Sequence, residues 1–203
     1  WDPKKYLEMM RRNPELKPEE FEFLQTRMTT VRELGIEAMR NVSVHHGKEQ
    51  KDRVRLTGAT PNLGVITNTQ PAVGRFLTEI ENHRRMHVAF IGNDLKDQFF
   101  PNANPIGKTI DIQGRPFEVI GVAKAKGSVF GDSQDAFVMI PIETYFKIYG
   151  FRSGMIFSAL ALDYGHLYRS LEEARMLLRA YRPVRPGDDD HFSMVTSDSL
   201  VAF

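Results

Sequence analysis

Residues 104–127 read NPIGKTIDIQGRPFEVIGVAKAKG, and this stretch has the tightest pattern in the chain. Apolar and polar residues alternate on both sides of Gly114, as in two strands joined by a tight turn. Two apolar positions of each strand point to one face: Ile110 and Ile112 in the first, and Phe117 and Val119 in the second. The stretch contains no cysteine, no histidine and no phosphate-binding loop. It therefore predicts a β-hairpin with no chemistry of its own.

The composition excludes some classes of protein. The 203 residues are 41% hydrophobic and 26% charged, which is ordinary for a globular protein with one large domain or two small ones. The 27 Lys and Arg residues nearly balance the 26 Asp and Glu residues, for a formal net charge of +1. A nucleic-acid-binding protein normally has a clear basic excess, so the balance argues against that class.

Cysteine usage and hydropathy give further bounds. The chain has no cysteine, which excludes disulfides and thiolate metal sites. No apolar run approaches the ~18 residues that a membrane-spanning helix needs. The sequence begins at Trp1, without an initiator methionine or the apolar core of a signal peptide. We therefore interpret the chain as an excised piece of a longer protein.

Proline opens two predicted helices near the N-terminal end. The first covers residues 3–12, and the second starts at Pro18, with an apolar face formed by Phe21, Leu24 and Met28. Residues 31–47 have helical spacing at their start and alternation at their end. A strand that ends near His45, and a second strand that returns over residues 52–60, are the favoured interpretation.

The rest of the chain mixes strands and short helices, which predicts an α+β fold. The elements expected besides the hairpin are a helix or loop over residues 60–71, an extended piece over 73–76, strands over 88–91 and 136–140, and helices over 95–99 and after Pro141. A strand–helix–strand unit closes the chain, with strands at 155–163 and 191–198 and a helix at 166–181. The apolar stripe of that helix is formed by Leu167, Leu171, Ala174, Leu178 and Tyr181.

No histidine or carboxylate group matches a metal-binding pattern. His45 and His46 are neighbours in a predicted strand, so their side chains face opposite ways. His83 and His87 are four residues apart but lack the glutamate of a metalloprotease helix. The sequence DDDH at residues 188–191 lacks the spacing of a calcium-binding loop and is interpreted as a solvated turn.

Motifs for phosphate binding and nucleophilic catalysis are absent too. GATPNLG at 58–64 has no Gly-Lys-Ser/Thr ending, FIGNDL at 90–95 lacks the G-x-G-x-x-G pattern, and no serine lies in a G-x-S-x-G elbow. The carboxylate pairs Glu19–Glu20 and Glu172–Glu173 are expected on solvated helix faces. The nine methionines are interpreted as core filling, and the alternative is a surface that binds varied apolar ligands. The sequence thus gives no catalytic, cofactor-binding or metal-binding residue, and no substrate-binding residue is assigned.

From Val54 onward, several short motifs occur in a recognisable order and spacing. They are Gly58-Ala59-Thr60-Pro61, Gly74-Arg75-Phe76, the strand 88–92, Asn104-Pro105-Ile106-Gly107-Lys108, the strand 117–122, and the strand 135–141 with its Ile-Pro ending. With these motifs, residues 16–200 resemble the periplasmic core domain of MacB-like ABC transporter permeases. One departure is the segment NHRRMH at 82–87, which is more basic than the acidic segment expected there.

The resemblance implies an α+β fold with two subdomains. Residues 1–78 and 151–203 would form a discontinuous porter-like βαβ subdomain. Residues 79–150 would form an inserted, strand-rich Sabre-like subdomain that contains the hairpin. A rigid piece that transmits motion needs well-defined turns and packing more than reactive groups, which accounts for a tight pattern without chemistry.

The resemblance also implies a place and a mechanism. The domain would lie on the periplasmic side of the bacterial inner membrane, as the soluble ectodomain of a permease. ATP hydrolysis in the cytoplasm would be coupled to a periplasmic conformational change that drives efflux or export, a mechanism called mechanotransmission. The implied partners are the parent permease helices, a cytoplasmic ATPase, a second copy of the domain, and a periplasmic adaptor or substrate. Enzymatic activity, cofactors and nucleic acid are not implied.

Two other functions are weighed against this one. A sensing or scaffolding ectodomain of a permease-like protein that transports nothing would use the same folded unit, and neighbouring genes would separate the two. A stand-alone enzyme would need turnover that is lost when His83 or His87 is changed. The hydropathy profile of the parent reading frame tests the permease interpretation, which needs one apolar span before Trp1 and three after Phe203.

Overall fold

The computed structural model describes residues 16–129, 132–151 and 154–182. The fold is α+β, as the sequence predicts. Its elements are α2 (Pro18–Arg27), β1 (Val31–His46), β2 (Glu49–Ala59), α3 (Leu63–Ile66), β3 (Pro71–Gly74), α4 (Glu79–His83), β4 (Val88–Ile91), α5 (Asn93–Phe99), β5 (Thr109–Ile112), β6 (Arg115–Ala123), β7 (Ser128–Val129), β8 (Asp132–Ser133), β9 (Phe137–Pro141), α6 (Ile142–Tyr149), β10 (Ile156–Ala161), the 3-10 turn η1 (Tyr164–His166) and α7 (Leu167–Tyr181). The helix predicted over residues 3–12 and the strand predicted over 191–198 lie outside the described residues.

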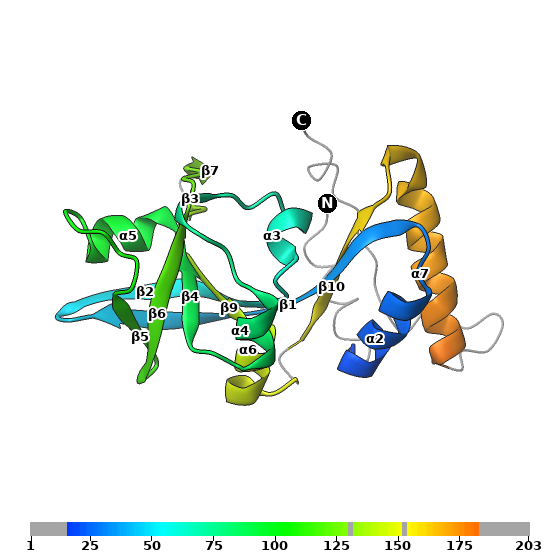
Figure 1. The fold of residues 1–203 in the computed structure, drawn as a ribbon, viewed down its shortest axis with the longest axis horizontal. Coiled ribbons are helices and arrows are strands. Elements are labelled where there is room, and N and C mark those ends of the chain that lie inside the picture. The colour runs from blue at the N-terminus through cyan, green and yellow to red at the C-terminus, as the bar shows by residue number, and fades with distance from the viewer. Residues whose placement is uncertain (1–15, 130–131, 152–153, 183–203) are drawn as a thin grey trace.

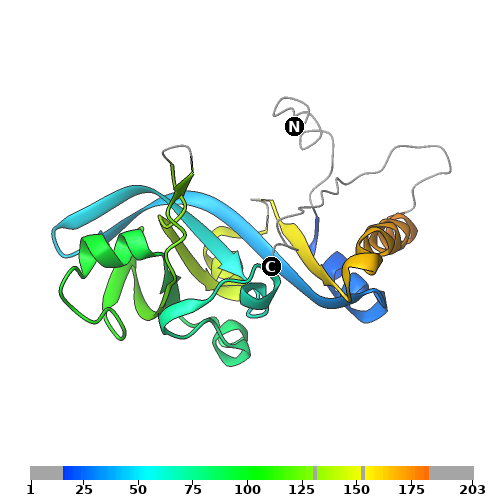
Figure 2. The same cartoon turned by 90° about the horizontal axis from the view of Figure 1, so that it is seen from above.

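The strand β1 organises the molecule. It is a single strand of 16 residues, so the strand interpretation of this segment is confirmed and the helical one is wrong. Its first part pairs with β10 and its later part pairs with β2, with the change of partner at Glu37. Figure 1 shows β1 running from the lobe of α2, α7 and β10 into the lobe that contains the other strands, and Figure 2 shows the same course from above.

The second lobe is built around a closed ring of strands. The order of pairing is β1–β2–β9–β4–β6–β5, and β5 pairs with β1 again. The β2–β9 and β4–β6 pairs are parallel, and the other pairs of the ring are antiparallel. Side chains from every strand of the ring enter one buried core: Val44, Val54, Val138, Ile91, Val119 and Ile112 among others. The ring is therefore a small barrel with a packed interior.

The predicted hairpin closes this barrel. Its strands are β5 and β6, and Ile110, Ile112, Phe117 and Val119 are all buried, as predicted. The turn residues Gln113 and Gly114 have φ values of 51° and 81°, which is the backbone of a type I′ turn between twisted strands. Two pairs, Val44 with Ile112 and His45 with Asp111, then join β5 to β1.

Helices α2 and α7 pack side by side in the first lobe (Figure 1). The ring centroids of Phe23 and Tyr181 are 4.9 Å apart across this contact. Glu20 is 1% exposed and forms an ion pair with Arg182, so the expectation that its carboxylate is solvated is wrong. The physical reason is the tertiary partner, which compensates the burial of a charge on an otherwise polar helix end.

The expected subdomain borders stay a prediction. Strands from residues 1–78 pair with strands from 79–150, because β2 pairs with β9 and β3 pairs with β6. One buried cluster also contains residues of both lobes, such as Leu24 and Val119. None of the helices described is long and apolar enough to cross a membrane.

Candidate functional site

The histidines weighed as metal ligands are not brought together. The Nδ1 atom of His46 lies 2.8 Å from the carbonyl oxygen of Thr109, and its ring packs against Phe100. The ring of His87 stacks on Phe117 with a centroid distance of 4.7 Å. Among the described residues, no group of three His, Cys, Asp or Glu side chains could hold a metal ion. The sequence DDDH at 188–191 lies outside those residues.

The Gly92 junction has a packing explanation. Gly92 lies between β4 and α5, the place where a dinucleotide-binding fold would put its glycine-rich turn. A β-carbon built on Gly92 would lie 2.1 Å from the carbonyl oxygen of Asp135. The glycine is therefore required because another backbone segment passes against it.

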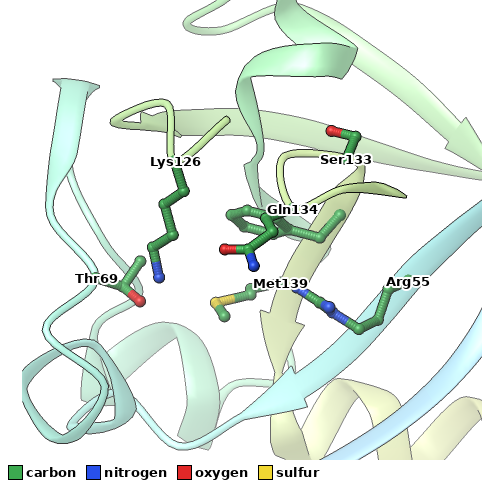
Figure 3. A pocket seen from close by; sticks show the side chains of 7 residues that line it. Arg55, Thr69, Lys126, Ser133, Gln134 and Met139 are labelled. Carbon is green, nitrogen blue, oxygen red and sulfur yellow. The ribbon is translucent and has the colours of Figure 1, made fainter. Parts of the chain in front are cut away.

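A hollow among the described residues lies beside β9, and we name it the β9 pocket (Figure 3). Its volume is about 420 Å³, and it is open to solvent. It is lined by Arg55, Thr69, Lys126, Ser133, Gln134, Phe137 and Met139. These residues come from β2, the loop after α3, the segment after β6, β8 and β9. The pocket is thus assembled from segments that are far apart in sequence.

The floor of the β9 pocket follows from strand alternation. Phe137 and Met139 are two residues apart on β9, so their side chains share one face of the strand. Both are buried, and Phe137 is the registered neighbour of Arg55 on β2. The guanidinium carbon of Arg55 lies 5.7 Å from the Phe137 ring centroid, within the range of a cation–π contact.

Asp135 fixes the rim of the pocket on the side of Lys126. Its side chain is buried, and the carboxylate accepts hydrogen bonds from the backbone N–H groups of Lys126 and Gly127. The shorter of the two Lys126 contacts and the Gly127 contact are both 2.8 Å long. The N–H of Asp135 itself donates to the Ser133 hydroxyl at 3.0 Å. These bonds hold the two sides of the β7–β8 hairpin together at its base and set the position from which Lys126 extends.

The lining of the β9 pocket has an excess of positive charge. Arg55 and Lys126 are cationic, and none of the seven lining side chains is acidic. Among the side chains that the structure describes, no carboxylate forms an ion pair with either cation. Glu37 is the acidic group that Arg55 influences at longer range. Burial raises the pKa of Glu37, and the Ser158 hydroxyl and the Arg55 charge offset part of that increase.

The sequence patterns did not indicate this pocket, and its Met139 was interpreted only as one of nine methionines that fill the core. Arg55 belongs to the predicted strand 52–60, where the alternation of polar and apolar residues predicts a solvent-facing side chain. Lys126 belongs to the run Lys-Ala-Lys at 124–126, which would be a usable signal of a local basic surface. Neither signal indicates that the two cations lie across one hollow, because that depends on the pairing of β2 with β9.

The fold is shared with ectodomains of ABC transporters. The crystal structure of the periplasmic region of MacB from Actinobacillus actinomycetemcomitans is similar with a TM-score of 0.70, at 22% sequence identity, over 83% of this chain and 75% of that one. The extracellular domain of the noncanonic ABC-type transporter YknZ from Gram-positive bacteria is similar with a TM-score of 0.71, at 19% identity, over 88% of this chain and 90% of that one.

The chain belongs to the MacB-like periplasmic core domain family, whose model matches residues 3–166. The resemblance found in the sequence motifs is therefore confirmed. A macrolide export ATP-binding/permease protein MacB of Chlorobium phaeobacteroides is 40% identical over 89 residues, which are 44% of this chain and 14% of that protein. The pyoverdine export ATP-binding/permease protein PvdT of Pseudomonas aeruginosa is 34% identical over 132 residues, which are 63% of this chain and 20% of that protein.

Proposed function

We propose that the chain is the extracytoplasmic domain of an ABC transporter permease and acts on the periplasmic side of the bacterial inner membrane. In this proposal, ATP hydrolysis by a cytoplasmic ATPase moves the domain, and the movement drives efflux or export. Membership of the family and the names of the relatives, which are ATP-binding/permease proteins, support it. The domain itself would contribute no catalytic residue and bind no cofactor.

The arrangement of α2, α7 and β1 carries the proposal. Helices α2 and α7 lie side by side although one is near the start and the other near the end of the described chain (Figure 1). A domain inserted between two membrane helices needs its entry and exit on one side, and the packing of α2 against α7 supports such an arrangement. From that base, β1 runs without interruption into the barrel, so a displacement of the base is passed to the barrel through one strand.

The proposal includes the partners and the division of the domain. The partners are the membrane helices of the parent permease, the ATPase and a second copy of the domain, with a periplasmic adaptor or the substrate as a further contact. Residues 1–78 and 151–203 would form the part joined to the membrane helices, and residues 79–150 the inserted part. The substrate class is not assigned by this proposal.

Spin-label distance measurements on the reconstituted transporter test it. The chain has no cysteine, so single labels can be placed at Lys48, in the β1–β2 turn, and at the exposed Met176 on α7 once the rest of the permease is free of cysteine. We expect the Lys48–Met176 distance within one copy to stay constant when ATP binds. The Lys48–Lys48 distance between two copies should change, because each copy moves as one body.

The outcomes separate the parts of the proposal. A change of the distance within one copy would contradict movement as one body. Constant distances both within and between copies, at full ATPase activity, would contradict mechanotransmission and favour a sensing or scaffolding role. A Lys48 label paired with a label at Glu49 is the control, since both residues lie at one hairpin turn and their separation should not respond to ATP.

A further inference from the structure

We propose that the β9 pocket binds an amphipathic organic anion, with the acidic group held between Arg55 and Lys126 and the apolar part on Phe137 and Met139. This goes beyond the transport role above, which assigns no ligand to the domain. Figure 3 shows the Arg55 and Lys126 side chains reaching toward the same space from opposite sides, with Gln134 and Met139 between them.

The charge of the pocket selects the sign of the ligand. Both cations are exposed, and no described carboxylate forms an ion pair with them. An anion can therefore bind to them without breaking an ion pair with a described carboxylate. Guanidinium and ammonium groups are strong hydrogen-bond donors to carboxylate, sulfonate or phosphate oxygens. Gln134 adds an amide, whose N–H₂ group can donate to the same anion.

The floor of the pocket selects the second part of the ligand. Phe137 and Met139 form the apolar part of the lining, and the guanidinium carbon of Arg55 lies 5.7 Å from the Phe137 ring centroid. Methionine and phenylalanine accept ring or alkyl groups of varied shape. The exposed part of these two side chains is small, 3% of Phe137 and 9% of Met139, and the apolar part of an amphipathic anion would cover it, which a bare inorganic anion cannot do.

The pocket has the size and the built rim of a ligand site. Its volume of about 420 Å³ falls in the range of about 300–1,000 Å³ for small-molecule sites. Asp135 holds the backbone of Lys126 and Gly127 through three hydrogen bonds, so the Lys126 side is positioned before any ligand arrives. Two sources of such an anion are open to test: a free small molecule, and the headgroup region of an anionic lipid.

Calorimetric titration of the 203-residue chain with naphthalene-2-sulfonate tests the proposal. We expect one site, and binding at least tenfold tighter than that of the uncharged 2-naphthylmethanol or of inorganic sulfate, each of which lacks one half of the ligand. The double variant R55Q/K126Q should bind the sulfonate at least tenfold more weakly, because both charge-assisted contacts are lost. Substitution M139A should weaken sulfonate binding and leave the response to sulfate unchanged.

The matched control is the double variant R53Q/K124Q. It removes the same charge from the neighbouring positions of the same two segments, neither of which lines the pocket. We expect it to bind within twofold of the unaltered chain. Equal loss in both double variants would overturn the site in favour of a general surface charge effect. Absence of sulfonate binding, or equal binding of sulfate, would overturn the amphipathic ligand.

Vesicle sedimentation distinguishes the two sources. The chain is mixed with phosphatidylcholine vesicles that contain or lack phosphatidylglycerol. Binding only to the anionic vesicles, lost in R55Q/K126Q and kept in R53Q/K124Q, would support the lipid as the source. If the chain ignores both vesicles but binds the sulfonate, a free anion is the source. Anionic vesicle binding that both double variants lose equally would overturn a pocket-bound lipid.

Discussion

Glu20, in the first turn of α2, and Arg182, directly after α7, form a two-point ion pair across 162 residues of sequence. The Arg182 Nη2 group donates to Glu20 Oε2 at 2.7 Å, and Nε donates to Oε1. The Glu20 side chain is 2% exposed and the Arg182 side chain 12% exposed. Glu20 also accepts the Lys17 N–H at 2.8 Å, so it caps α2 while it holds the end of α7.

Replacement of Glu20 by glutamine should lower the free energy of unfolding by about 3 kcal/mol, because the charged half of a largely buried ion pair with Arg182 is replaced by a neutral amide. Urea unfolding followed by circular dichroism measures this difference. The control is Glu22→Gln on the exposed face of the same helix, which should change the free energy by less than about 0.5 kcal/mol. Equal effects of the two substitutions would contradict a structural role for the pair.

Glu173 on α7 makes stability depend on pH. Its carboxylate accepts the N–H and hydroxyl groups of Thr29 at 2.9 and 2.8 Å, and those of Thr30 at 3.0 and 2.5 Å. Burial raises the pKa of Glu173, but the hydrogen bonds from Thr30 and Thr29 outweigh it and leave the pKa below its ordinary value of 4.5. A lowered folded-state pKa stabilises the protein above pH 4.5, and this contribution is lost as pH falls through the folded pKa.

The variant Glu173→Gln should therefore be less stable than the unaltered chain at pH 7, and the difference should shrink as the pH falls below 4.5. Unfolding free energies measured in urea from pH 7 down to the acid limit of folding test this. Glu172→Gln serves as the control, since its side chain is 73% exposed beside Arg175. A difference for Glu173→Gln that is constant with pH would show that the carboxylate charge is not what stabilises this contact.

Local patterns in the sequence were sufficient for the elements whose signals lie within a few residues. Pro18 opens α2, Gly114 turns the β5–β6 hairpin, and the apolar run at 88–91 is a buried strand. Closure of the strands into a ring could not be predicted in the same way, because the residues near a strand do not indicate which distant strand it pairs with. The pairing of β2 with β9 and of β1 with β5 joins segments separated by many tens of residues.

The candidate site was harder to predict for the same reason. Arg55 and Lys126 are ordinary polar positions in their own segments, and the β2–β9 register together with the Asp135 hydrogen bonds to Lys126 places them across one pocket. Glu20 was expected in solvent because a helix start favours an acidic residue by itself. Its partner Arg182 follows α7, so the burial of the pair depends on helix packing that no local pattern records.

Substitution of Gly92 by alanine tests whether close backbone approach explains this glycine. The added β-carbon would meet the Asp135 carbonyl oxygen at 2.1 Å, and a backbone atom cannot move aside as a flexible side chain can. We expect the free energy of unfolding to fall by about 2 kcal/mol. Gly165→Ala is the matched control, because its β-carbon would have its nearest neighbour at 3.3 Å. An unchanged stability of Gly92→Ala would contradict the packing explanation.

The barrel closure predicts where the molecule opens first when it is weakened. Ile112 is 1% exposed and is paired with Val44, which is completely buried, in one of the two residue pairs that join β5 to β1. Ile112→Ala should lower the free energy of unfolding by about 3 kcal/mol, since it leaves a cavity where β5 pairs with β1. Thr109→Ala, on the exposed side of the same strand, should cost less than about 0.5 kcal/mol.

Hydrogen exchange separates local opening of the β1–β5 contact from global loss of stability. In Ile112→Ala, amides of β5 should exchange faster by a larger factor than amides of α7, because the cavity releases the β1–β5 contact before the α2–α7 lobe. An equal increase in the exchange rates of β5 and α7 amides would mean that the barrel and the helical lobe open together. It would contradict local opening at the β1–β5 contact. The comparison thus measures how tightly β1 couples the two lobes, which is the property that transmission of movement requires.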